Sequence, residues 1–163
     1  MRWLLHLAFA WELFCLAVKN ILLCVLGTVG FCVVLNVPQN KIFSVIIGAF
    51  VCSLTFEMLF EYTSLGIFAC TLTAVVIAHT YSEIAARILK TPSTVILIPS
   101  TVPLLPGGYL FYAMSNLVTG DKSAFIYNAR QTALVAFAIA LGSVITLIVL
   151  NIIRRIKAVL QRR

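Results

Sequence analysis

Residues 98–109 read IPSTVPLLPGGY, and this stretch decides how the rest of the chain is interpreted. It lies inside a long apolar segment, where an unbroken membrane-spanning helix would otherwise be expected. Its three prolines each remove a backbone donor and clash with the preceding turn, and its two adjacent glycines add permissive backbone. In hydrocarbon, each freed N–H or C=O group is costly unless protein or cavity water satisfies it. The stretch therefore predicts an interrupted helix that lines a cavity or packs against other helices.

The composition of the whole chain is that of an integral membrane protein. Of the 163 residues, 62% are hydrophobic and 10% are charged, whereas soluble domains average about 25% charged residues. The net charge of +7 gathers at the ends of apolar segments, which is typical of membrane topology, so we expect no nucleic-acid partner. No polar block is long enough for a soluble domain. We expect residues 1–163 to form a single transmembrane domain in the lipid bilayer.

Five apolar segments are long enough to cross a bilayer, because a spanning helix needs about 20 mostly apolar residues. The predicted fold is therefore an all-α integral membrane protein with about five transmembrane helices, at residues 11–37, 42–60, 65–89, 94–117 and 128–153. The fourth helix contains the Pro/Gly-rich break, and a basic tail follows at 154–163. Asn36 and Pro38 mark a tight turn after the first span. A four-span arrangement, in which the first or the fourth segment is re-entrant, is the alternative.

The distribution of basic residues predicts the orientation of these spans. The tail holds five basic residues, and the positive-inside rule places it in the cytoplasm. With five spans the N-terminus is then outside. This arrangement puts eight basic residues inside, including Lys41, Arg87 and Lys90, against three outside. We therefore expect a multi-pass membrane protein with a cytoplasmic C-terminus.

The interrupted fourth span is the strongest candidate for a substrate site. Broken helices in transporters expose half-helix ends, whose dipoles and free backbone groups bind ions and anionic groups near the membrane midplane. A proline-kinked structural helix is the alternative, but a kink needs one proline and this stretch has three. The predicted substrate-binding residues combine the break with the polar side chains around it: Ser100, Thr101, Pro103, Pro106, Gly107, Gly108, Tyr112 and Asn116.

Ionisable residues inside membrane segments are the candidates for proton coupling or gating, because they are expensive there. Glu57 is one such group, with an interfacial or partner-paired carboxylate as the alternative; Glu61, one turn further, suits a solvated helix end. His79, Glu83 and Arg87 follow at spacings of four and share one helix face. They form a second candidate cluster, with a solvated cytoplasmic helix end as the alternative.

No pattern typical of an enzyme is found in the chain. It contains no Gly-x-Ser-x-Gly, His-Glu-x-x-His, Walker or Gly-x-Gly-x-x-Gly motif. With five acidic residues and two histidines, a catalytic triad or a metal site would need side chains from another chain. We therefore expect no enzyme activity, no metal and no cofactor.

Three stretches of this sequence resemble the threonine/serine exporter family, in its short stand-alone membrane form. They are GFCVVLNVP at 30–38, SEIAARILKTP at 82–92, and IPSTVPLLPGG at 98–108, the last followed by YAM at 112–114 and GD at 120–121. Ser100 stands where the family usually has glycine, and Leu35 where it usually has an aromatic residue. The pieces follow one another in the family's order over essentially the whole chain.

The resemblance implies a membrane subunit of a secondary exporter for small amino or carboxylic acids, located in the bacterial cell membrane (the inner or plasma membrane). The substrates would be threonine and serine, or a succinate-like dicarboxylate, with export driven by the proton gradient or the membrane potential. It also implies a larger complementary membrane subunit that carries the other half and a soluble domain; a homo-oligomer is the other arrangement. A non-transporting membrane scaffold that regulates a partner transporter is the competing hypothesis from a different functional class.

Overall fold

The computed structural model describes residues 19–63 and 66–160, and every regular element in these ranges is a helix. The predicted all-helical fold is thus confirmed. The first element, Lys19–Val34, is a short apolar helix. The others are α2 (Gln39–Tyr62), α3 (Ile67–Ile88), α4 (Ser93–Ser100), the 3-10 helix η1 (Val102–Leu104), α5 (Gly107–Thr119) and α6 (Lys122–Leu160).

Three of the described helices are long and apolar enough to cross a membrane: Gln39–Glu61, Ile67–Ile88 and Lys122–Ile156. A fourth crossing is made if Ser93–Leu104 and Gly107–Thr119, which meet at a bend of 52°, count as one broken span. The predicted first span extended over 11–37, and residues 11–18 of it lie outside the described part. The described residues therefore give three to four spans, and the predicted count of five is not confirmed.

The last helix is longer than the sequence pattern indicated. We expected a span at 128–153, whereas α6 covers Lys122–Leu160. The helix begins early because the Asp121 carboxylate accepts hydrogen bonds from the backbone N–H groups of Ser123 and Ala124, at 3.1 Å each, and so caps its first turn. α5 ends just before, at Thr119, and the next residue, Gly120, has a φ of 81° in the left-handed region that favours glycine.

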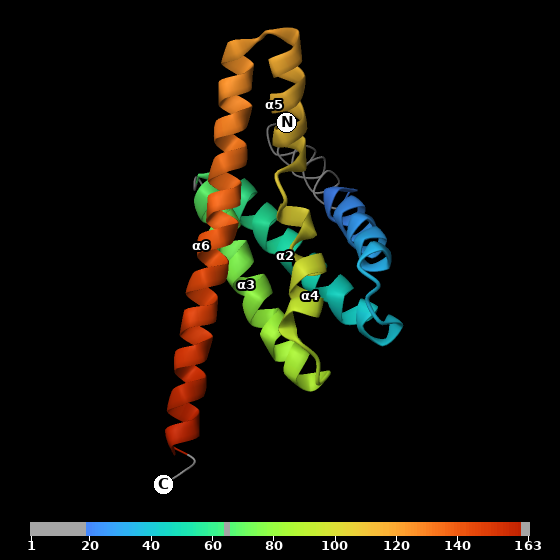
Figure 1. Ribbon diagram of the computed structural model, residues 1–163, viewed down its shortest axis with the longest axis vertical. Helices are drawn as coiled ribbons and strands as arrows, with labels where there is room; N and C mark the ends of the chain where they lie inside the picture. Colours follow the sequence, from blue (N-terminus) through green and yellow to red (C-terminus); the bar gives the residue numbers. More distant parts are fainter. Residues whose placement is uncertain (1–18, 64–65, 161–163) are drawn as a thin grey trace, which may run out of the picture.

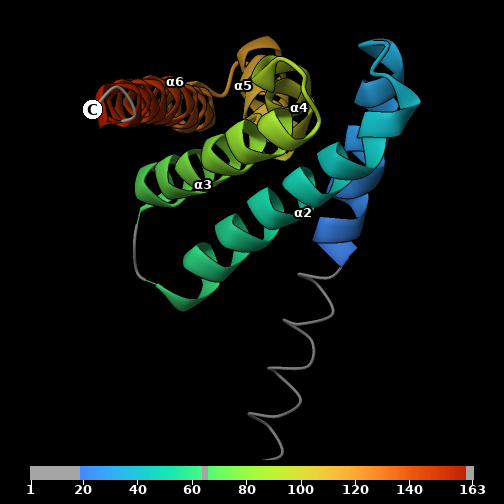
Figure 2. The ribbon, with the colours of Figure 1, turned by 90° about the horizontal axis from the view of Figure 1, so that it is seen from below.

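The helices form a layered array with α6 along one side. Figure 1 shows α6 running along most of the length of the molecule, with α5 beside its N-terminal half and α3 beside its C-terminal half. Seen along the long axis in Figure 2, α6, α3, α2 and the helix Lys19–Val34 follow one another across the molecule, with α4 against α2 and α3. The break between α4 and α5 thus lies where the bundle gives way to the α5–α6 pair.

Two clusters of small and medium-sized apolar side chains form the interior. One joins the end of the first helix to α2, α3 and α4: Cys32, Val37, Val45, Ala85, Ala86 and Ile96. The other joins α2, α3 and η1, with Ile139 of α6 packed against it: Cys52, Ala74, Val75, Ala78 and Leu104. Small residues at these contacts let the helix backbones approach closely, as is usual between membrane helices.

Candidate functional site

Each proline of residues 98–109 occupies a distinct place in the interrupted helix. Pro99 lies inside α4, one residue before the helix ends at Ser100. Pro103 lies in the first turn of η1, where its missing N–H group costs little. Pro106 immediately precedes α5. The helix is therefore interrupted at this stretch, as predicted, and the structure shows that the chain changes from α-helix to 3-10 helix and back within a few residues.

A cavity of about 350 Å³ lies beside this break. Its volume is at the lower end of the range of about 300–1,000 Å³ that is usual for small-molecule sites. Five elements and the short connection between η1 and α5 contribute to its wall: Phe56 from α2, Ile67 and Thr71 from α3, Pro103 and Leu104 from η1, Leu105 and Pro106 from the connection, Gly108, Tyr109 and Tyr112 from α5, and Asn128 and Val135 from α6.

The N-terminus of α5 opens onto this cavity without a side-chain cap. The Gly107 N–H donates to the Leu105 carbonyl at 2.7 Å, and the first full helical bond runs from the Leu110 N–H to the Pro106 carbonyl at 2.9 Å. The N–H groups of Gly108 and Tyr109, which come between, have no acceptor among the described residues. Free N–H groups and the positive end of the helix dipole favour an anionic ligand here.

Half of the predicted substrate-binding residues line this cavity and half do not. Pro103, Pro106, Gly108 and Tyr112 form part of its wall. The four that lie outside it are Ser100, Thr101, Gly107 and Asn116. Whether any of the eight touches a substrate stays a prediction.

Ser100 is engaged in the packing of α4 against α2. Its side chain is fully buried, and its hydroxyl donates to the Val45 carbonyl at 3.3 Å. Gly48 makes room for it: a Cβ at Gly48 would lie 2.5 Å from Ser100 Oγ. Thr101 bonds back to its own helix, because its hydroxyl donates to the carbonyls of Leu97 and Ile98. These hydroxyls thus satisfy backbone groups near the break.

Several polar groups of the cavity wall were missed by the sequence analysis. Thr71 lies in the middle of an apolar helix, where its hydroxyl donates to the Ile67 carbonyl at 2.8 Å. Asn128 bonds the Ala124 carbonyl of its own helix at 2.9 Å. A polar residue within an apolar helix is a signal that could have drawn attention to both. Thr71 and Asn128 lie near Tyr109 at the cavity because α3, α5 and α6 pack together there, which the sequence alone does not predict.

The predicted proton-coupling or gating residues lie away from the cavity wall, in two separate places. Glu57 lies on α2, where the side-chain amide of Asn20 approaches its carboxylate at 3.5 Å. His79, Glu83 and Arg87 lie together on α3. His79 is 2% exposed, and its Nδ1 atom has no hydrogen-bond partner among the described residues. Their roles stay predictions.

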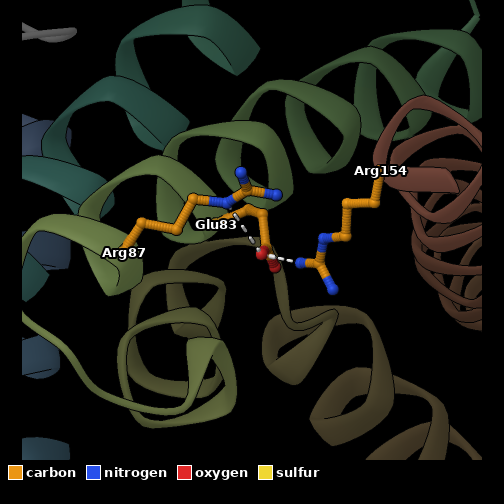
Figure 3. Close-up of polar contacts among 3 residues, drawn as sticks. All are labelled: Glu83, Arg87 and Arg154. Carbon is orange, nitrogen blue, oxygen red and sulfur yellow. Dashed lines mark ion pairs between the residues drawn. The ribbon is translucent and has the colours of Figure 1, made fainter. Parts of the chain in front are cut away.

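Glu83 is the centre of a charged cluster that also includes a residue of α6. Its side chain is 8% exposed, and its Oε1 atom lies 3.5 Å from Nε of Arg87. The guanidinium of Arg154 contacts the same oxygen from the neighbouring helix (Figure 3). From the sequence, we expected Arg87 on the same helix face as Glu83 and Arg154 in the cytoplasmic tail. The structure adds this residue of α6 to the predicted α3 cluster.

Comparison with known protein families gives a match that covers most of the chain. The model of the family described as Threonine/Serine exporter, ThrE, matches residues 20–149, which is well over half of the chain. Searches of curated proteins and of solved structures return no match. The matched region runs from the first described helix through the break and into α6. The chain is therefore a member of the threonine/serine exporter family of membrane transport proteins.

Proposed function

We propose that this chain is a membrane subunit of a secondary exporter and that its substrate binds in the cavity beside the interrupted helix. The observation that carries this proposal is the uncapped N-terminus of α5, where Gly108 and Tyr109 have free N–H groups and line a cavity of small-molecule size. A carboxylate placed there would meet donors and the positive end of the helix dipole, in surroundings that are otherwise largely apolar.

The cavity wall favours a small amino acid over a dicarboxylate. It contains no charged side chain, so the α5 N-terminus offers a place for one carboxylate. The aromatic faces of Phe56, Tyr109 and Tyr112 can receive an ammonium group through cation–π attraction. A second carboxylate would meet hydrogen-bond donors such as the tyrosine hydroxyls, but no cation. Threonine and serine are therefore the substrates we would test first, with a succinate-like dicarboxylate as the second class.

The energy for export would come from the proton gradient or the membrane potential. Glu57, His79 and Glu83 are the groups on α2 and α3 that could carry a proton, with Arg87 part of the gate. In this proposal the chain lies in the bacterial inner membrane with a cytoplasmic C-terminus. It works with a larger complementary subunit, or with a second copy of itself, which would cover the cavity.

The two glycines that open α5 offer a matched test. Gly108 lines the cavity and Gly107 does not, and a Cβ at either would meet nothing within 4 Å. Gly108→Val should fill the site without disturbing the fold and lower threonine export at least tenfold, which corresponds to about 1.4 kcal/mol. Gly107→Val should stay within about twofold of the wild type. Export of labelled threonine from loaded cells, normalised to protein in the membrane, measures both.

Two outcomes would count against the proposal. Equal export by the two glycine variants would show that the substrate does not pass this cavity. If the Gly108→Val chain still assembles with a partner transporter and export by that complex is unchanged, the chain is needed only for assembly. This outcome would favour the alternative, a non-transporting membrane scaffold. Competition with unlabelled serine and succinate in the same assay separates the two substrate classes.

A further inference from the structure

Arg154 makes a contact that its position near the end of the chain does not suggest. It belongs to the C-terminal part of α6, and its guanidinium reaches the buried carboxylate of Glu83 on α3 (Figure 3). Among the side chains that the structure describes, the ion pairs are those of Glu83 with Arg87 and with Arg154. Since Arg87 lies on the same helix as Glu83, the pair with Arg154 is the one that joins two helices.

The rest of the contact between α3 and α6 is close but has little polar specificity. At Gly142 the backbone of α6 approaches α3 so closely that a Cβ would lie 3.0 Å from Val75 Cγ1 and 3.3 Å from the Leu72 carbonyl oxygen. Packing of small residues brings helices together. A single buried polar or charged pair is a better-attested means of fixing the register of two helices. The Arg154–Glu83 pair is placed to do this for α3 and α6.

The register of α6 matters because the same helix forms part of the cavity wall. Asn128 and Val135 line the cavity, and Arg154 is 26 residues beyond Asn128, or about 39 Å along an α-helix. A shift or rotation of α6 at Arg154 is therefore carried by one continuous helix to the cavity at the other end. Movements of one helix past another by about one turn are a known form of switching.

The charges around Glu83 allow this pair to open without leaving a bare buried carboxylate. The Arg87 and Arg154 side chains are 55% and 46% exposed, whereas that of Glu83 is 8% exposed. Both arginines contact the same atom, Oε1. If Arg154 leaves, Arg87 still pairs with Glu83, and the freed guanidinium is already partly in water. The free-energy cost of a change in which Glu83 goes from two arginine partners to one is therefore lower than the cost of breaking an isolated buried pair.

We propose that Arg154 is a positioning residue of the transport cycle. Its pair with Glu83 holds α6 in register against α3 in the conformation seen here, and release of Arg154, with Glu83 left to Arg87, frees α6 to move the cavity wall. This inference rests on the proposed export function. The contact between α3 and α6 would then alternate between a held and a released state during transport, in addition to contributing to the folding of the bundle.

Neighbouring arginines provide a matched pair of variants. Arg154→Ala should lower export of labelled threonine at least tenfold per molecule in the membrane and also alter KM, because the cavity wall is no longer held in place. Arg155→Ala removes the same charge from the same segment and should change export less than about twofold. Arg154→Lys keeps a cation that can pair with Glu83 and should retain most of the export. Equal effects of the two alanine variants would overturn the proposal.

A reversible cross-link separates release from simple fixation. Glu83→Cys and Arg154→Cys are combined in a background that lacks the five native cysteines, and the pair is bridged by a reducible bis-methanethiosulfonate. If the pair must open, export stays below one tenth of the wild-type rate while bridged, although the register is held. If bridging restores export relative to the unbridged protein, Arg154 only fixes the register and the proposal fails. Absence of export by the wild-type chain would instead contradict the proposed function.

Discussion

α4 and α5 together take the place of one membrane-spanning helix, yet they are held in different ways. α4 packs against both α2 and α3, and three of its eight residues, Ile96, Pro99 and Ser100, are buried. α5 packs chiefly against α6, and Ala113 is its one buried residue. Figure 1 shows the same difference, with α4 against α2 and α3 and α5 beside the upper part of α6.

The comparison shows what the break separates. Ser100 anchors the end of α4 through its hydrogen bond to the Val45 carbonyl, whereas the first N–H groups of α5 are free at the cavity. The prolines between them remove the backbone bonds that would couple the two halves. One half of the interrupted span is thus tied to the bundle, and the other half is tied to the helix that carries Arg154. A movement of α6 would carry α5 with it and leave α4 in place.

The largest expected effect comes from disturbing the anchored half. In Gly48→Ala, the new Cβ would lie 2.5 Å from Ser100 Oγ and 3.0 Å from Tyr81 Cε1, so these side chains or the backbones of α2 and α4 must shift. Overpacking of this kind costs about 1–3 kcal/mol. We expect a lower thermal unfolding midpoint in detergent. Adding Ser100→Gly should restore much of the loss, because it removes the clashing hydroxyl and Cβ; a double variant no more stable than Gly48→Ala would contradict this account of the contact.

A smaller effect is expected when the anchor itself is removed. Ser100→Gly alone loses one buried hydrogen bond, which contributes about 1 kcal/mol. It should speed hydrogen exchange of the amides of α4 while leaving those of α5 unchanged, and wild-type α5 should already exchange faster than α4. Hydrogen–deuterium exchange in detergent measures both helices at once. Equal protection of the α4 and α5 amides in the wild type would show that the two halves of the span are not held differently.

The smallest effect concerns the turn that joins α5 to α6. Hydrogen bonds from the Ser123 hydroxyl and the Ala124 N–H lower the pKa of Asp121 below its usual value of 3.8. The capping contribution is therefore fully present at neutral pH and is lost as the pH falls through the depressed pKa. Asp121→Asn keeps the acceptor without the charge, so protection of the Ser123 and Ala124 amides should weaken at low pH only in the wild type. The same pH response in both would exclude the carboxylate as its cause.

Much of the fold could be predicted from local chemistry. Apolar segments of spanning length, Pro99, Pro103 and Pro106 followed by two glycines, and the basic tail are each recognisable without knowing what lies beside them. The helical fold and the place of the break follow from them, because proline and chain length act locally. The family patterns at 30–38, 82–92 and 98–108 likewise depend only on residue order. These features indicated the family before any packing was known.

The tertiary structure decided which residues meet across helices. Ser100 was expected at a substrate and is found against Gly48 and the Val45 carbonyl; Asn128 was not expected and lines the cavity. Arg154 looked like part of a tail that fixes membrane orientation, and it reaches a buried carboxylate on α3. The physical reason is that apolar helices can pack against one another in many registers and rotations. The sequence pattern predicts on which face of its own helix a residue lies, but it does not predict which helix packs against that face.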